Sequence, residues 1–319
     1  MTITQDLSAP LVAVVGATGT QGGSVIKALA ASDKLYRIRG FTRDAEKKSA
    51  QELIRQGVDI VTVSLVLDNV REVYKAFAGA NVAFIVTNFW EHLDMERETA
   101  EGKMLIDAAK AAGASRIIWS GLMSVTKLSG GKYRNAVHFD GKAAVTEYGR
   151  QCGVPFVDVQ AGFYASNFLD NSAMLSKQDD GSFAIAWPVK PTTVVPVIDT
   201  AHDYGLFVRK AVELPVVPDG LEILTCGEGV MAKDLAVQLS AVTGKKIVYK
   251  QVPVKELGQR FASIGLPPHI VADMEDAFAS FEEFGHYGGK AASSPEGLGR
   301  PLRTFREFVE LSDWSKVLA

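Results

Sequence analysis

Short runs of β-branched residues alternate with longer amphipathic stretches along the first half of the chain. The runs predict six strands, at residues 11–15, 36–42, 58–63, 82–87, 116–120 and 156–160. The stretches between them repeat apolar residues at helical spacing and predict helices at residues 22–31, 45–56, 70–77, 95–112 and 139–152. Four of these helices are followed by a glycine that suits a left-handed helix end: Gly57, Gly79, Gly113 and Gly153. This alternation is typical of an α/β fold with a parallel sheet between two layers of helices.

The pattern becomes less regular after Gly162. It predicts short strands at residues 182–186, 194–198, 221–226 and 246–252, and helices at residues 200–212, 231–243, 254–263 and 268–284. Residues 285–301 are rich in Gly, Ser and Pro and predict a loop, which a terminal helix follows from Thr304. We therefore expect a smaller α+β lobe that is interleaved with the last strands of the sheet.

Composition narrows the classes of partner and compartment. The chain has 319 residues, of which 47% are apolar, and this is enough for one large or two moderate cores. Its formal net charge of -3 provides no positive field for a phosphate backbone, so we expect no direct contact with nucleic acid. No apolar run approaches the roughly 20 residues that cross a bilayer, and residues 1–10 lack the pattern of an export signal, so we expect a cytoplasmic protein that does not enter membranes. The two cysteines, Cys152 and Cys226, have no CxxC spacing and support neither a disulfide framework nor a metal site.

A glycine-rich loop connects the first predicted strand to the first predicted helix. Its seven residues, which we call the glycine loop, are Gly16, Ala17, Thr18, Gly19, Thr20, Gln21 and Gly22. The first glycine permits a tight turn, the second lets the backbone approach a pyrophosphate, and the third lets the helix pack close to the strand. The G-x-x-G-x-x-G spacing is typical of short-chain and extended dehydrogenases. It predicts a doubly wound Rossmann domain that binds a dinucleotide over residues 1–160, with residues 161–319 forming the smaller lobe.

The end of the second predicted strand indicates which dinucleotide binds. An NAD site places an acidic residue there for the ribose hydroxyls, whereas this strand is followed by Arg43, and Lys47 lies one helical turn further on. Two cations suit a 2′-phosphate, so the sequence favours NADP. In the alternative interpretation, Arg43 and Lys47 are solvated charges at the start of a helix, and Asp44 weakens the signal for a phosphate.

Candidate catalytic groups surround the fifth predicted strand. Short-chain dehydrogenases use Tyr-x-x-x-Lys on the next helix, where the tyrosine moves a proton and the lysine holds the nicotinamide ribose. Residues 138–142, HFDGK, keep the lysine and lack the tyrosine. Lys142 is therefore a candidate ribose ligand and, if buried, a candidate acid–base catalyst, and His138 is either a general acid or a surface or capping residue. Ser124, and with it Ser120, lies where this class places a hydroxyl that polarises a carbonyl group.

Two further segments follow strands at the carboxyl edge of the sheet, where doubly wound folds bind ligands. An amide or aromatic side chain there can flank a nicotinamide, or can simply pack beneath the second lobe. The residues are Asn88, Phe89 and Trp90 after the fourth strand, and Phe163, Tyr164 and Asn167 after the sixth.

Several of these segments together resemble the NmrA-like family, which includes a mammalian redox-sensing member. They are GATGTQGGSV, FTRD, VTNFWE, SGL and HFDGKAAVTEYGRQCGVPF, and the resemblance is densest before Asn167. It implies an extended-dehydrogenase fold and NADP as the cofactor. The family contains both transcription-factor regulators without evident catalysis and reductase-like proteins.

Carried over by position, the resemblance implies cofactor contacts from a set of residues already singled out. These are the glycine loop, Arg43, Lys47, Asn88, Phe89, Trp90, Lys142, Phe163 and Tyr164. One segment departs from the family, which usually has an acidic Gly-Asp-x-x-Asp stretch near the adenine after the third strand. This chain has VSLVLD there, so that only Asp68 or the backbone of Leu67 is expected to contact the adenine.

Three functions remain open at this point. The first is an NADPH-dependent reductase of a small carbonyl, enone, imine or quinone. The second is a non-catalytic NADP(H) sensor that regulates a partner such as a transcription factor, or forms a homodimer, with a nuclear location in addition to the cytoplasm. The third is an interaction protein whose nucleotide pocket is vestigial, which the intact glycine loop disfavours.

Overall fold

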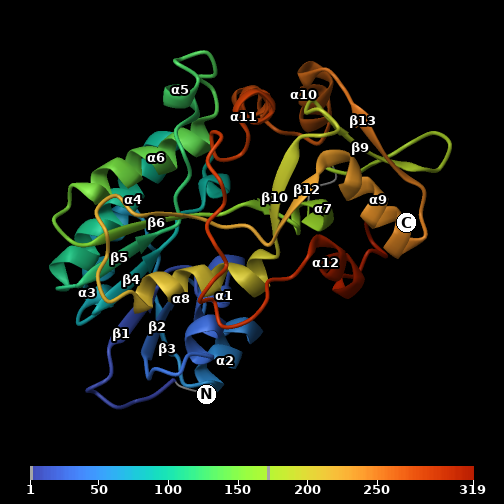
Figure 1. Cartoon of the computed structure of the whole chain (residues 1–319). Coiled ribbons are helices and arrows are strands. Elements are labelled where there is room, and N and C mark those ends of the chain that lie inside the picture. Colours follow the sequence, from blue (N-terminus) through green and yellow to red (C-terminus); the bar gives the residue numbers. More distant parts are fainter. Residues whose placement is uncertain (1–2, 171–172) are drawn as a thin grey trace.

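Seven parallel strands form the central sheet in the described part of a computed structural model, which comprises residues 3–170 and 173–319 (Figure 1). Residues 1 and 2 lie outside the described part. They are the first two of residues 1–10, for which the sequence predicts no export signal. The strand order is β11-β6-β5-β4-β1-β2-β3, so the order reverses between β1 and β4. The strands are β1 (Leu11–Val14), β2 (Arg37–Thr42), β3 (Asp59–Thr62), β4 (Val82–Ile85), β5 (Arg116–Trp119), β6 (Phe156–Gln160) and β11 (Glu222–Leu224).

Helices cover both faces of this sheet, and the composition of β1 shows why. All four residues of β1 are buried: Val12 and Val14 pack into the core on one face, and Ala13 packs into the core on the other. The first face is covered by α1 (Thr20–Ala30), α2 (Lys48–Arg55) and α8 (Gly205–Glu213), and the second by α3 (Val70–Phe77), α4 (Met95–Ala111) and α6 (Val137–Arg150). A strand without a polar face is stable only between two apolar layers.

The second lobe contains two three-stranded sheets around a core of its own, rich in aromatic rings. One sheet has the order β12-β10-β7 and the other β13-β9-β8. Their strands are β7 (Phe163–Tyr164), β8 (Ser176–Lys177), β9 (Phe183–Trp187), β10 (Val194–Ile198), β12 (Glu228–Met231) and β13 (Ile247–Gln251). The helices of the lobe are α7 (Asn167–Asp170), α9 (Ala232–Thr243), α10 (Val254–Ser263), α11 (Pro268–Phe284) and α12 (Phe305–Leu311).

The predicted fold class, a doubly wound parallel sheet with a smaller α+β lobe, is confirmed. The four glycines expected at helix ends have φ angles between 77° and 93°. The helix predicted at residues 200–212 begins with a π-helical turn, Thr200–Tyr204, before α8. None of the described helices is long and apolar enough to cross a membrane.

Candidate functional site

A cavity of about 880 Å³ lies where the strand order reverses, at the carboxyl ends of β1 and β4. Its walls come from the glycine loop, from the segments that follow β2, β4, β5 and β6, and from α10 and α11 of the second lobe. Ligands of doubly wound folds bind at this topological switch point. The cavity brings together most of the site residues predicted from the sequence.

The glycine loop has the geometry of a phosphate cradle. Gly16 has a φ of +65°, and a Cβ on Gly22 would lie 2.2 Å from the Gly16 carbonyl oxygen, so the first turn of α1 lies directly against the loop. No described side chain caps α1 at Gly19, and its first turn contains no acidic residue. Thr18 and Thr20 also line the cavity. The free amides and the helix dipole are therefore available for an anion.

Gln21 connects the glycine loop to the segment after β6. Its Nε2 atom donates a hydrogen bond to the hydroxyl of Tyr164, and burial raises the pKa of Tyr164 to about 12, so the phenol stays protonated at neutral pH. The Oε1 atom of Gln21 is buried and has no hydrogen-bond partner among the described residues. A buried acceptor without a partner fits a site that a ligand completes.

Arg43 and Lys47 both line the outer end of the cavity. The Nη1 atom of Arg43 lies 2.6 Å from Oε1 of Glu91, which follows β4, so the pair joins two segments across the mouth of the cavity. Arg43 is 67% exposed and is accessible to a ligand phosphate. Both cations therefore line the cavity, as the sequence predicts. Arg43 also faces the carboxylate of Glu91, a contact that the sequence did not predict.

The segment after β3 contacts the cavity through different residues than expected. Leu65 and Val66 line the cavity, whereas Leu67 and Asp68, the predicted adenine contacts, do not. They belong to a short 3₁₀ helix, η1 (Leu67–Asn69), that leads into α3. The turn carries both side chains past the cavity, and Leu65 and Val66 make the cavity wall apolar at this point.

The turn after β4 supplies one amide and two rings to the cavity: Asn88, Phe89 and Trp90. The rings belong to a short 3₁₀ helix, η2 (Phe89–Glu91), and their centroids are 5.4 Å apart in an edge-to-face arrangement. Phe89 is buried and Trp90 is 49% exposed. Trp90 therefore does not pack fully beneath the second lobe, and its ring is available to a ligand.

Lys142 lies in the cavity wall and is held by three hydrogen bonds. Its Nζ atom donates to the carbonyl and hydroxyl oxygens of Thr87, both at 3.0 Å, and to Oε1 of Glu98 at 2.9 Å. The Glu98 side chain is 3% exposed, and its Oε2 atom has no partner among the described residues. The ion pair fixes the ammonium group in the wall. Its three N–H donors are all used by Thr87 and Glu98, so a ligand hydroxyl would bind Lys142 by replacing one of the Thr87 contacts.

His138 lines the same part of the cavity, packed among aromatic rings. Its Nδ1 atom forms a hydrogen bond with Asp273 of α11, and its backbone N–H donates to the same carboxylate at 3.0 Å. Asp273 is fully buried. The two residues are 135 positions apart, and nothing in the sequence pattern pairs them.

Ser124 does not line the cavity. It caps the short helix α5 (Val125–Leu128) by accepting a hydrogen bond from the Lys127 amide at 3.1 Å, and its hydroxyl donates to Asp140 at 2.7 Å. Its place after β5 thus reflects helix capping, which is the usual role of serine at such a position. The buried Ser120 lines the cavity instead.

The second lobe provides an apolar wall that sequence reasoning missed, beside the predicted Phe163 and Asn167. The missed residues are Met174, Phe261, Ile264, Leu266, Met274, Ala277, Phe278, Phe281 and His286. Burial lowers the pKa of His286 to about 4, and its Nε2 atom lies 3.1 Å from the Ala161 carbonyl oxygen. His286 is therefore neutral at pH 7, and its side chain contributes no charge to the cavity.

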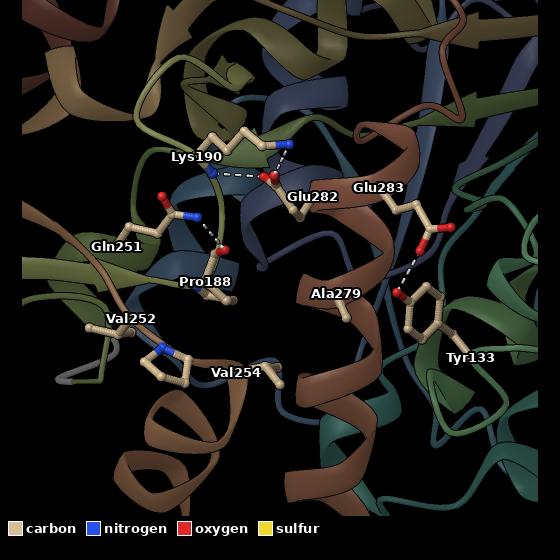
Figure 2. A pocket seen from close by; sticks show the side chains of 10 residues that line it. Tyr133, Pro188, Lys190, Gln251, Val252, Val254, Ala279, Glu282 and Glu283 are labelled. Carbon is tan, nitrogen blue, oxygen red and sulfur yellow. Dashed lines mark hydrogen bonds and ion pairs between the residues drawn. The ribbon is translucent and has the colours of Figure 1, made fainter.

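A second depression, of about 770 Å³, lies between α11 and the segment that joins β13 to α10 (Figure 2). Its two acidic side chains already have partners: Glu282 pairs with Lys190, and Glu283 accepts from Tyr133. Figure 2 shows both pairs at its rim. No cluster of three His, Cys, Asp or Glu side chains in the described ranges is arranged to hold a metal ion. The cavity at the switch point is therefore the candidate functional site.

Comparison with known proteins agrees with this geometry. The NmrA-like family matches residues 8–310. An NmrA-like family domain-containing oxidoreductase of Penicillium ochrochloron, ptmS, is 27% identical over 302 residues, which are 90% of this chain and 88% of that protein. The nitrogen metabolite repression protein nmrA of Emericella nidulans is 29% identical over 302 residues, covering 90% of this chain and 82% of that protein.

Solved structures of Nmra, a negative transcriptional regulator, superpose closely on this chain. The complex with NAD has a TM-score of 0.77 at 27% identity, and the complex with NADP has a TM-score of 0.75 at 25% identity. Each comparison covers 95% of both chains. Together with the family match over residues 8–310, these similarities show that the chain belongs to the NmrA-like family.

Proposed function

We propose that this chain binds NADP(H) and acts as an atypical reductase of the short-chain-dehydrogenase type, on a small carbonyl, enone, imine or quinone. The observation that carries the proposal is one continuous cavity. It runs from an uncapped glycine loop to an apolar wall in the second lobe, with Lys142 and His138 between these two ends. A nucleotide bound at the loop would extend towards that wall and leave room there for a second, uncharged molecule.

The preference for NADP over NAD rests on Arg43 and Lys47, which line the outer end of the cavity. A 2′-phosphate would gain a charge-assisted hydrogen bond from the guanidinium group. Nmra has been solved with NAD and with NADP, so this fold can accommodate either dinucleotide, and the proposed preference depends on the two cations of this chain.

Each part of the proposed chemistry has a candidate group in the cavity. NADPH, when bound, supplies a hydride. Lys142 would hold the nicotinamide ribose, His138 would hold a proton for the substrate, and the rings of Phe89 and Trp90 would exclude water from the reacting end. We assign residues 1–160 to the cofactor domain and residues 161–319 to the substrate lobe, although β11 and α8 of the second range complete the main sheet and its helical layer.

A second function, a non-catalytic NADP(H) sensor that acts on a regulatory partner protein or through a homodimer, is favoured by one observation. Lys142 is tied to Glu98 and Thr87, which suits binding better than proton transfer. The similarity to a negative transcriptional regulator points the same way. We propose a cytoplasmic location for either function, and a nuclear one in addition for the sensor.

Calorimetric titration with NADPH, NADP, NADH and NAD tests the binding proposal. We expect tight, phosphate-dependent binding, and a loss of about tenfold or more in NADPH affinity in Arg43→Ala, since tenfold corresponds to about 1.4 kcal/mol. Arg71→Ala is the matched control, because Arg71 is exposed and lies outside the cavity. Absence of binding to all four nucleotides would refute both functions.

Two assays then separate the reductase from the sensor. The reductase consumes NADPH with at least one enone, imine, carbonyl compound or quinone. The sensor shows no turnover, and its sedimentation or partner binding differs between the NADPH, NADP and nucleotide-free states, since a ligand shifts an equilibrium only through differential affinity.

A further inference from the structure

We propose that Asp273, on α11 of the second lobe, is the positioning residue that orients His138 as the proton donor of the reaction. The proposal rests on the reductase function given above and assigns the group that replaces the missing tyrosine. The structure combines a cavity-lining imidazole, a fully buried carboxylate in contact with it, and rings that hold the imidazole in place.

Asp273 binds His138 at two points. One carboxylate oxygen accepts from the His138 backbone N–H at 3.0 Å, and the other forms a hydrogen bond with Nδ1. The preceding residue at the helix start, Ala136, supplies no side-chain cap to α6. Asp273 therefore caps α6 from another lobe and holds the imidazole with the same carboxylate.

This contact determines which ring nitrogen faces the cavity. An ionised carboxylate only accepts hydrogen bonds, so Nδ1 of His138 carries the proton in this pair. No described residue forms a hydrogen bond with Nε2, which leaves that nitrogen for a ligand. The ring centroids of Phe89, Trp90 and Phe139 lie 5.9, 5.4 and 4.6 Å from that of the imidazole and restrict its rotation.

The proton step follows from this orientation. In its doubly protonated form His138 donates the Nε2 proton to the substrate oxygen or nitrogen, as the electron pair of the double bond moves onto that atom while the hydride reaches the carbon. His138 is left neutral, with its remaining proton on Nδ1 and bound to Asp273. A proton from solvent restores Nε2–H, so the cycle consumes one hydride and one proton for each substrate reduced.

Asp273→Asn separates orientation from capping. The asparagine oxygen still accepts from the His138 backbone N–H, whereas the amide no longer requires a proton on Nδ1. Asp276→Asn is the matched control: Asp276, on the same helix, accepts from the backbone and side-chain nitrogens of Asn135 at 2.8 and 2.9 Å and does not contact His138.

The first readout is the histidine tautomer, measured by nitrogen NMR on protein labelled with ¹⁵N-histidine. The chain has five histidines, and His138→Gln identifies the signal of interest. In the wild type, with and without NADPH, we expect the neutral form of His138 to carry its proton on Nδ1. A neutral form protonated on Nε2 would overturn the proposal, and this result does not depend on whether Asp273→Asn folds.

The second readout is steady-state kinetics. We expect Asp273→Asn to lower kcat at least tenfold, because a positioned general acid contributes about 10²–10⁴-fold, and to leave the KM for NADPH within about twofold. Asp276→Asn should keep the kcat of the wild type. Equal kcat values for Asp273→Asn and the wild type would reduce Asp273 to a helix cap and overturn the proposal. A wild type that binds NADPH but reduces no substrate refutes the reductase function instead, whatever the tautomer.

Discussion

A buried carboxyl group in the main sheet, next to its edge strand β11, should make the stability of this protein depend on pH. Asp158, on β6, is fully buried behind Gly121 of the cavity wall. Its Oδ2 atom accepts from Gln160 at 2.9 Å, and its Oδ1 atom has no hydrogen-bond partner among the described residues. Burial raises the pKa of Asp158 from 3.8 to about 7, against the opposing hydrogen bond from Gln160 and with a smaller contribution from the charge of Glu222.

The sign and size of the effect follow from this pKa. Because the pKa is higher in the folded state, the contribution to stability is fully present below about pH 4 and is lost as the pH rises through about 7. A shift of about three units corresponds to roughly 4 kcal/mol in all, of which more than half is lost between pH 5 and pH 8. Asp158→Asn removes the ionisation and keeps an acceptor for Gln160.

Urea unfolding followed by tryptophan fluorescence, between pH 5 and pH 8, measures this effect. We expect the free energy of unfolding of Asp158→Asn to rise relative to the wild type by roughly 2–3 kcal/mol over that interval. Asp33→Asn, the same change at an exposed position, should follow the wild type. Parallel curves for Asp158→Asn and the wild type would show that the carboxyl group is not desolvated in the folded protein, and would refute the reasoning.

Three further substitutions test the cavity. Gly22→Ala places a methyl group 2.2 Å from a carbonyl oxygen of the glycine loop. We therefore expect the free energy of unfolding in urea to fall by roughly 1–3 kcal/mol and NADPH to bind more weakly. Unchanged stability would contradict the close packing of α1 against the loop. Glu98→Gln leaves the buried ammonium group of Lys142 without its charge partner, so thermal unfolding should show that the free energy of unfolding falls by roughly 3 kcal/mol. A melting temperature equal to that of the wild type would show that this ion pair does not stabilise the fold. Glu91→Gln removes the carboxylate that pairs with Arg43 and leaves the guanidinium free for the 2′-phosphate. Calorimetry should show an NADPH affinity about fivefold higher, because such a half-exposed pair contributes up to about 1 kcal/mol. An equal gain for NADH would exclude this explanation.

The main sheet could be predicted from the sequence because its strands and helices have local signatures. The strand at Phe156–Gln160 and the helix at Val70–Phe77 were predicted with their observed bounds, since each has an unambiguous apolar pattern. The edge strand Glu228–Met231 was missed, because it combines a charge, a glycine and two apolar residues with no clear period. Strands of two residues, such as Phe163–Tyr164, depend on pairing with β10 and leave no pattern at all.

The candidate site likewise has residues that the sequence predicted and residues that it could not predict. The glycine loop, Arg43 and Lys142 were found because the function of each depends on its distance along the chain from a strand. The pairing of His138 with Asp273 and the apolar wall from α10 and α11 depend on how the second lobe folds back over the sheet, which no local spacing encodes. Ser124 shows the opposite error, since a position typical of catalysis is occupied by a helix cap.

The place of β11 in the main sheet bears on how the chain folds during synthesis. β11 pairs with β6, yet 61 residues separate Gln160, the last residue of β6, from Glu222, the first residue of β11. At about 5–20 residues per second, a ribosome needs roughly 3–12 seconds to deliver that interval, during which β6 has an unpaired edge. The nascent protein therefore passes through a stage in which its main sheet lacks only β11 and is open to aggregation along the exposed edge of β6.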